Sequence, residues 1–272
     1  MHDTTLSSRA RYIVTKVPEV TIWFWVIKIL TTALGESTSD YLVFHTNPYL
    51  AVIGGFVAFV IAIILQFSVR KYIPWVYWLA ALMVAVFGTM AADVVHVVLG
   101  VPYLVSVIGF ATALVIIFAA WYASEKTLSI HSIYTFRREV FYWLTVLATF
   151  ALGTATGDLT AMTFGWGYLS SGIIFGIVIA VIAFSHFIMK AILGAEHKHL
   201  SRNAVLAFWL AYVFTRPFGA SFADWMGKER SIGGLGWGDG VASLLLFIPL
   251  VLLVGYLQKS HADVDRKRTA AS

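Results

Sequence analysis

The chain is a succession of eight long apolar segments joined by short polar ones. A helix needs about 20 mostly apolar residues to cross a bilayer. Four segments have this length with almost no ionisable side chain, namely 49–66, 101–124, 159–189 and 240–258. Four charged segments alternate with them, namely 20–43, 73–98, 140–158 and 203–225. Because a β-barrel would instead show alternating segments of roughly ten residues, the sequence predicts an all-α polytopic membrane protein with eight transmembrane helices.

Composition excludes several other classes of protein. Charged residues make up 12% of the chain, against about 25% in an ordinary soluble domain, which is too few to cover a water-facing surface. The net charge of +5 does not indicate a nucleic-acid partner, because basic residues of a membrane protein sort to one side of the bilayer. The chain has no cysteine, which excludes disulfides, thiolate zinc sites and cysteine nucleophiles.

The distribution of Lys and Arg predicts the orientation in the membrane. If the N-terminus is cytoplasmic, Lys228 and Arg230 fall in outer loops. Lys28 and Arg216 fall within spans, which leaves the other 15 of the 19 basic residues on the inner side. Such an excess marks the cytoplasmic face, so we expect both termini inside. Residues 1–18 lack a cleavage site behind an apolar stretch, so we expect the first apolar segment to remain as a span.

The four charged segments are copies of one pattern: an aromatic residue, Trp, nine residues, Gly, four residues and Asp. The repeated residues are Trp25, Trp78, Trp143 and Trp209, then Gly35, Gly88, Gly153 and Gly219, then Asp40, Asp93, Asp158 and Asp224. The spacing is the same in every copy, without gaps. The sequence therefore predicts an internal fourfold repeat, in which we assign the Trp and Gly residues structural roles.

One apolar segment follows each copy, so each repeat is predicted to be a two-helix hairpin that starts and ends in the cytoplasm. Such copies are parallel, in contrast to the inverted repeats of many transporters, and predict a bundle with pseudo-fourfold or nested twofold symmetry. The predicted divisions are an N-terminal cytoplasmic segment 1–18, repeat 1 at 19–70, repeat 2 at 71–125, a cytoplasmic loop 126–139, repeat 3 at 140–192, a cytoplasmic loop 193–202, repeat 4 at 203–258 and a basic cytoplasmic tail 259–272.

This pattern resembles a known family. A Trp-bearing two-helix unit, four times in tandem, is similar to the bacterial "uncharacterised membrane-anchored protein" family, which is built from four copies of a repeat of unknown function. The resemblance covers about 20–257 and is carried by the repeated Trp, Gly and Asp, most closely at 35–40 (GESTSD) and 215–221 (TRPFGAS). It implies this architecture and a multi-pass location in a bacterial inner membrane, and it brings no activity.

The four repeated Asp residues are the predicted functional centre. About 22 Å of helix separates each Trp from its Asp, which places the Asp in the outer part of a hydrocarbon layer about 30 Å thick. Ionised carboxylates at this depth face a bundle interior or a wet cavity, and rings of Asp or Glu favour cations. The positions four and seven before each Asp share its helical face and hold mostly small or oxygen-bearing residues. We therefore expect the charged helices inside and the apolar helices outside.

The copies also differ from one another. The first adds Glu36 one turn before its Asp, and the second adds His96 three residues after its Asp. The fourth adds Arg216 and Pro217. We expect the proline to kink or break the helix, and the arginine to serve either as a binding or gating element or as a countercharge to one carboxylate. The predicted ion-binding residues are Asp40, Asp93, Asp158, Asp224, Glu36, Arg216 and His96, of which the five carboxylates are the predicted metal ligands.

We expect a transporter or exporter of a small cation, divalent or proton-coupled. Carboxylate, hydroxyl and carbonyl ligands suit magnesium, manganese, calcium or protons, and histidine would admit a softer divalent metal. Two alternatives stay open: a passive cation channel, and a non-transporting scaffold or sensor whose Asp residues are structural. No nucleophile–base pair stands out, so we predict no enzyme and no cofactor, with the cation as substrate. The expected partners are the lipid bilayer and the cation, and a homo-oligomer is left open.

Overall fold

The computed structural model describes residues 15–193 and 198–264, and within them eight α-helices and no β-strand. The helices are α1 (Ile22–His45), α2 (Pro48–Ser68), α3 (Pro74–Asp93), α4 (Tyr103–Glu125), α5 (Phe136–Asp158), α6 (Tyr168–Leu193), α7 (Lys198–Gly227) and α8 (Asp239–Ser260). Parts of the predicted segment 1–18, loop 193–202 and tail 259–272 lie outside the described residues.

Seven of the described helices, α2 to α8, are long and apolar enough to cross a membrane. The eighth, α1, has 24 residues but carries Lys28, Glu36 and Asp40. The prediction of eight spans is therefore met by length and composition in seven helices. The chain is a multi-pass membrane protein whose first helix carries three charged side chains.

Local sequence signals set several helix starts. Pro48 stands at the first helical position of α2, where its missing N–H costs nothing. The Asn47 side chain accepts hydrogen bonds from the next two backbone N–H groups at 3.0 and 3.3 Å. In α5 the Thr135 hydroxyl accepts from the Arg138 N–H at 3.3 Å. Proline and capping side chains thus start these helices at the points where a polar turn gives way to an apolar segment.

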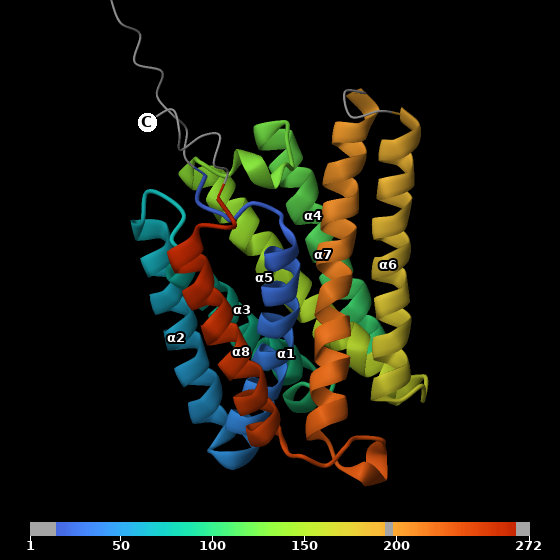
Figure 1. Cartoon of the computed structure of the whole chain (residues 1–272). Helices are drawn as coiled ribbons and strands as arrows, with labels where there is room; N and C mark the ends of the chain where they lie inside the picture. The colour runs from blue at the N-terminus through green and yellow to red at the C-terminus, as the bar shows by residue number, and fades with distance from the viewer. Residues whose placement is uncertain (1–14, 194–197, 265–272) are drawn as a thin grey trace, which may run out of the picture.

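Four helices form an inner bundle, and the other four lie around it (Figure 1). The inner helices are arranged in a ring in which α1 contacts α3, α3 contacts α5, α5 contacts α7 and α7 contacts α1. Within the membrane-length parts of α3, α5 and α7, 56–61% of the residues are buried, against 11–22% in α2, α4, α6 and α8. The charged helices are therefore the inner ones, as the sequence predicts.

The outer helix of each repeat packs mainly on the inner helix of the next repeat. α2 lies against α3, α4 against α5 and α6 against α7, and α8 returns to α1 and closes the circle. The two helices of one repeat contact each other far less. One two-helix unit cannot bury its apolar face alone, so each hairpin packs on the neighbouring unit.

The repeated glycines lie at the four crossings of the inner ring. A Cβ added at each of these glycines would touch the neighbouring inner helix. At Gly35 it would touch Ala85 of α3, at Gly88 Phe150 of α5, at Gly153 Arg216 of α7, and at Gly219 Thr32 of α1. Each glycine thus faces the inner helix that comes next around the ring. Small residues allow helix backbones to approach closely in membranes, so these glycines set the interhelical spacing.

We expect Gly35→Ala to destabilise the protein by about 1–3 kcal/mol. The new methyl group would overlap the Ala85 side chain and lie 3.0 Å from its carbonyl carbon, and this backbone cannot move aside without separating α1 from α3. The thermal unfolding midpoint in detergent micelles measures the effect. Gly54→Ala is the matched control, since a Cβ at this helical glycine of α2 meets nothing within 4 Å. Equal shifts in both variants would contradict the assignment.

Both ends of the described chain lie at one end of the bundle, here called the terminal end (Figure 1). The α1–α2 and α7–α8 turns lie at the opposite end, here called the turn end. Backbone N–H groups of Lys16 and Glu19 donate to the carbonyls of Ile133 and Asp263, both at 3.0 Å. Lys16 also pairs at 2.6 Å with the carboxylate of Glu139, which is fully buried. Packed chain therefore closes the terminal end.

The aromatic–Trp pairs form a layer in the terminal half of the inner bundle. Trp78, Trp143 and Trp209 are at most 5% exposed. Their rings pack on aromatic neighbours from other inner helices, for example Tyr77 with Trp143 at 5.5 Å and Tyr142 with Trp209 at 6.1 Å between centroids. These three repeated Trp residues therefore pack in the core and do not anchor the bundle in a lipid interface.

Candidate functional site

A buried arginine lies inside the inner bundle. Arg216 of α7 is 0% exposed, and its Nη2 contacts one side chain from each other inner helix: Glu36 of α1, Thr89 of α3 and, at 2.7 Å, Thr154 of α5. Thr89 also donates a hydrogen bond to Glu36 at 3.2 Å. These partners occupy one position of the repeat, four residues before the Asp. Three copies of the repeat thus build a polar socket for a guanidinium that the fourth copy supplies.

The surroundings of Arg216 explain how α7 accommodates it. Gly153 has no side chain where one would overlap the arginine stem. The Phe150 ring covers the guanidinium at 5.0 Å. α7 continues through Pro217, so of the expected kink or break the break does not occur, because packing against neighbouring helices holds proline-containing membrane helices together. Within the described residues, Nε and Nη1 of Arg216 have no hydrogen-bond partner.

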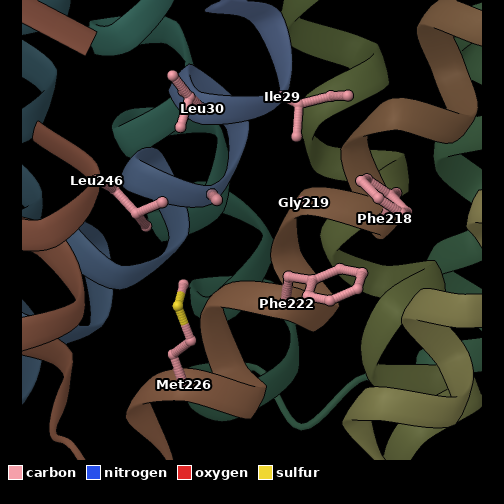
Figure 2. Close-up of a pocket in the computed structure, with 8 residues that line it drawn as sticks. Ile29, Leu30, Phe218, Gly219, Phe222, Met226 and Leu246 are labelled. Carbon is pink, nitrogen blue, oxygen red and sulfur yellow. The ribbon is translucent and has the colours of Figure 1, made fainter. Parts of the chain in front are cut away.

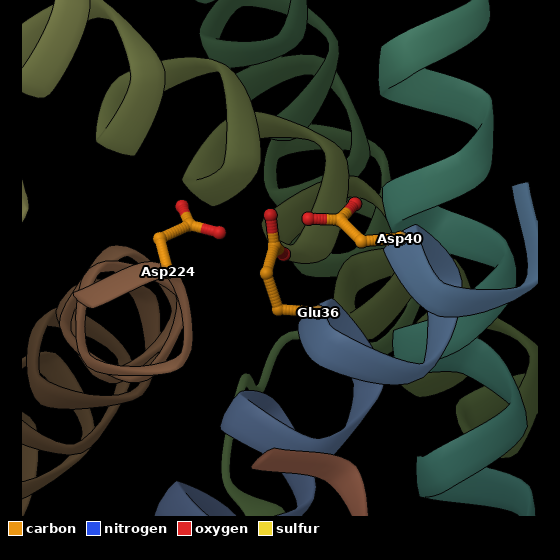
Figure 3. Close-up of side chains that lie close together, drawn as sticks. All are labelled: Glu36, Asp40 and Asp224. Carbon is orange, nitrogen blue, oxygen red and sulfur yellow. The ribbon is translucent and has the colours of Figure 1, made fainter. Parts of the chain in front are cut away.

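Three carboxylates lie together toward the turn end. Glu36, Asp40 and Asp224 are 3–8% exposed, and each offers an oxygen within 4.8 Å of the others. Figure 3 shows Asp40 of α1 and Asp224 of α7 on opposite sides of Glu36, with their carboxylates turned toward it. Glu36 also pairs with Arg216. A cation bound to these three carboxylates would therefore compete with the arginine for Glu36.

Lys228 supplies positive charge to this cluster. It follows the end of α7, and its ammonium pairs with Asp40 and lies 3.8 Å from both Asp224 and Asp239. Burial alone lowers the pKa of Lys228, but the carboxylates of Asp40 and Asp224 outweigh this effect and raise the pKa above its ordinary value. Lys228 is therefore protonated at neutral pH and holds a positive charge against these carboxylates.

The four repeated Asp residues are not equivalent. Asp93 and Asp158 end α3 and α5, and each is followed by a π-helical turn, Val94–Val98 and Leu159–Thr163 respectively. Both are half-buried, and neither belongs to the three-carboxylate cluster found in the described residues. Both interact electrostatically with Asp40. The repeat therefore supplies two direct members of the cluster and two acids that add to its negative potential.

His96 lies apart from the cluster. Its ring packs on Tyr103 with 4.3 Å between centroids, and its Nδ1 lies 3.4 Å from the Val101 carbonyl. In the part of the chain that the structure describes, no hydrogen bond or ion pair joins it to a carboxylate. The part of His96 in ion binding stays a prediction.

Sequence reasoning missed Lys228, which it left in an outer loop, and the roles of Thr89 and Thr154. The signal for Lys228 is its position four residues after Asp224, the spacing of a helical ion pair. The signal for the threonines is that three copies hold an oxygen-bearing side chain at the same repeat position as Glu36. Neither signal says that these groups meet, since that depends on how the helices cross.

An apolar pocket lies between α1, α7 and α8 (Figure 2). It has a volume of about 260 Å³ and is lined by residues such as Ile29, Phe218, Phe222 and Leu246. This lining offers no ligand for an inorganic cation. The carboxylate cluster is therefore the candidate site.

The charged helices form an inner ring around a buried polar centre, and the apolar helices pack outside this ring. This arrangement defines a multi-pass membrane protein of four tandem repeats. The chain belongs to the family described as Repeat of Unknown Function (DUF347), whose model matches residues 23–72, 76–127, 141–191 and 207–262. The four matches coincide with the four copies of the Trp, Gly and Asp pattern, and the family resemblance is confirmed. No curated protein and no solved structure matches the chain, so its function is argued from the site.

Proposed function

We propose that the protein is a transporter of a small cation, which binds to Glu36, Asp40 and Asp224 in place of Lys228. We place it in a bacterial inner membrane with the terminal end in the cytoplasm, because the basic segments of the sequence gather at that end. In this orientation the carboxylate cluster lies in the outer half of the membrane. The cation would reach it from the outside or leave it toward the outside.

The observation that carries the proposal is an excess of carboxylates around the site. The six acids in this region are Glu36, Asp40, Asp93, Asp158, Asp224 and Asp239. Arg216 and Lys228 are the cations paired with them, which leaves four negative charges if all six acids are ionised. Unbalanced charge inside a membrane protein is costly, and a bound divalent cation relieves it. Oxygen ligands of this kind suit hard cations.

A passive channel has less support. Toward the terminal end the bundle axis holds Arg216, Phe150, Lys28 and Tyr212, each at most 1% exposed. Conduction requires sites that ions both enter and leave along a continuous path. Two fully buried basic side chains on the axis oppose the passage of cations, whereas a transporter exposes its site to one side at a time.

A scaffold with structural Asp residues makes a different prediction. The pair of Arg216 and Glu36 suits a structural role equally well. The carboxylate cluster around Lys228 distinguishes a scaffold from a cation transporter, because a purely structural cluster is not expected to bind an added cation. Removing one of its carboxylates would then change stability and leave cation binding absent in both proteins.

The test is cation uptake into proteoliposomes that contain the purified protein. With Mn²⁺, Ca²⁺ and Mg²⁺ each tested alone, we expect saturable uptake of at least one ion. Asp40→Asn removes one of three ligands, and we expect the half-saturating concentration to rise about tenfold. Glu229→Gln is the matched control, because it removes an exposed acid from the same end of the bundle and should leave uptake unchanged.

Three results would count against the proposal. Uptake that rises linearly without saturation would indicate the channel. Absence of uptake for all three ions, with folded protein in the vesicles, would favour the scaffold. Equal uptake by the wild type and by Asp40→Asn would show that the cation binds elsewhere.

A further inference from the structure

The chain just before α1 crosses the terminal end of the bundle (Figure 1). Residues 15–19, here called the terminal strap, lead directly into α1. Val17 of the strap is 3% exposed and packs in the hydrophobic core of the bundle. The strap is therefore built into the terminal end, and cation binding at the carboxylate cluster, toward the other end, makes no use of it.

Backbone hydrogen bonds fix the strap to three separate parts of the chain. Thr15 accepts from the Tyr72 N–H between α2 and α3 at 3.2 Å, Lys16 donates to the Ile133 carbonyl between α4 and α5 at 3.0 Å, and Glu19 donates to the Asp263 carbonyl after α8 at 3.0 Å. Two of these connections lead into the inner helices α3 and α5. The strap thus joins the starts of three inner helices, α1, α3 and α5, at the terminal end.

One ion pair ties the strap to the inner helix opposite α1. The Lys16 ammonium lies 2.6 Å from the carboxylate of Glu139, in the first turn of α5, and also donates to the Phe67 carbonyl at 3.2 Å. Gln66 donates to the second oxygen of Glu139 at 2.9 Å, and Glu139 is 0% exposed. In the inner ring α1 and α5 each contact α3 and α7, so they stand opposite one another. The ion pair therefore spans the ring at its terminal end.

Cation transport requires this end of the bundle to open. The carboxylate cluster lies toward the turn end, and buried side chains such as Arg216, Phe150 and Tyr212 lie between it and the terminal end. A transporter exposes its site to one side at a time, so one step of transport in either direction connects the cluster with the cytoplasm. The terminal parts of the inner helices have to separate in that step, and α1 cannot move away from α5 while Lys16 holds Glu139.

We propose that the terminal strap is the inner gate of the transporter and that the ion pair of Lys16 with Glu139 is its latch. This inference rests on the proposed cation transport. A buried ion pair suits a latch, because the desolvation of both charges offsets much of their attraction. When the gate opens, water reaches the two charges and hydrates them, so the separated state costs little more than the paired one. The contact therefore has two discrete arrangements, as a switching element requires.

A reversible cross-link tests whether the strap has to move during transport. The carboxylate of Glu19 lies 3.2 Å from Nδ1 of His131, between α4 and α5, and these side chains are 26% and 51% exposed, so reagents reach both positions. Because the chain has no cysteine, the double variant Glu19→Cys/His131→Cys offers two thiols only to a bifunctional methanethiosulfonate reagent applied before reconstitution. We expect the cross-link to reduce uptake of Mn²⁺, Ca²⁺ or Mg²⁺, whichever the wild type takes up, about tenfold or more, and dithiothreitol to restore it. Binding of the same ion in detergent should stay within about twofold, because the cluster lies toward the other end. Each single-cysteine variant, treated in the same way, is the control.

A buried thiol on the strap tests the latch. Cysteine is a small apolar residue that suits the buried position of Val17, and the thiol of Val17→Cys reacts with a maleimide only when the strap leaves the core. Adding Lys16→Met leaves Glu139 unpaired in the closed gate, where an isolated buried charge is costly, and so favours release of the strap. We expect labelling in detergent to become about tenfold faster or more. Lys71→Met in the same background is the control, because it removes an exposed lysine near the terminal end and should leave the rate unchanged.

The outcomes distinguish the gate from the proposed transport. Undiminished uptake by the cross-linked protein would overturn the gate and leave cation transport standing. Loss of cation binding together with uptake would also overturn it, because the cross-link would then act on the cluster itself. Absence of uptake by the wild type would remove both proposals. If the double-cysteine variant does not fold, the Val17→Cys series decides, and a labelling rate that Lys16→Met leaves unchanged overturns the gate.

Discussion

Arg216→Met is expected to destabilise the protein by about 3–5 kcal/mol. The substitution leaves the Glu36 carboxylate 3% exposed with its charge unbalanced, and leaves Thr89 and Thr154 without the guanidinium between them. An unpaired buried charge is far more costly than the pair itself is stabilising. Unfolding by heat or SDS in detergent micelles measures the change.

A double-mutant cycle identifies the cause. Adding Glu36→Gln to Arg216→Met removes the orphaned charge, and we expect most of the lost stability to return. Arg137→Met is the control, because the Arg137 side chain is 69% exposed and lies 3.9 Å from Glu125, and an exposed ion pair contributes about 0–1 kcal/mol. Effects that simply add in the double variant would contradict a direct interaction between Arg216 and Glu36.

Lys228→Met is expected to tighten cation binding about ten- to hundredfold, the range that one charge-assisted contact spans. In the wild type the ammonium occupies the carboxylates of Asp40 and Asp224, so an added cation has to displace it. Because these carboxylates raise the pKa of Lys228, the competition persists at neutral pH. The stabilisation from this pair is therefore present below the ordinary lysine value of 10.5 and is lost only as the pH rises through the raised value.

Calorimetric titration with Mn²⁺ in detergent measures this affinity. Arg230→Met is the matched control, since Arg230 lies in the same loop and donates to the Leu235 carbonyl at 3.2 Å. It should leave the affinity near that of the wild type. Weaker binding by Lys228→Met would mean that the lysine organises the carboxylates and does not compete with the cation.

Much of the fold follows from the sequence. The spacing of Trp, Gly and Asp predicts the four repeats, and the location of the charged side chains predicts which helices are inside. The packing between repeats does not follow, because sequence neighbours usually pack together. The contacts of each outer helix with the next repeat, and the glycine crossings of the inner ring, show how each repeat packs on its neighbour.

The site is less predictable than the fold. Glu36, Asp40, Asp224 and Arg216 all stand out as charges in apolar segments, because charge inside a membrane is rare. A fourfold repeat predicts that its four Asp residues are equivalent, yet only two of them join Glu36 in the cluster. The copies also differ in backbone, since α3 and α5 change to π-helical turns immediately after their Asp. The role of Lys228 could not be predicted, because the sequence does not show which acids lie around a lysine in a loop.

The closing contact of α8 on α1 bears on how the protein is made. Synthesis delivers α1, with its two acids Glu36 and Asp40, before α7 and α8. Their basic partners, Arg216 and Lys228, follow 180 and 188 residues later, and α8, which covers α1, comes after them. The acids of α1 therefore wait for α7 and the loop after it before their charges are neutralised. A chain that ends before α7 lacks both basic partners of Glu36 and Asp40, so we expect it to leave these two carboxylates unpaired.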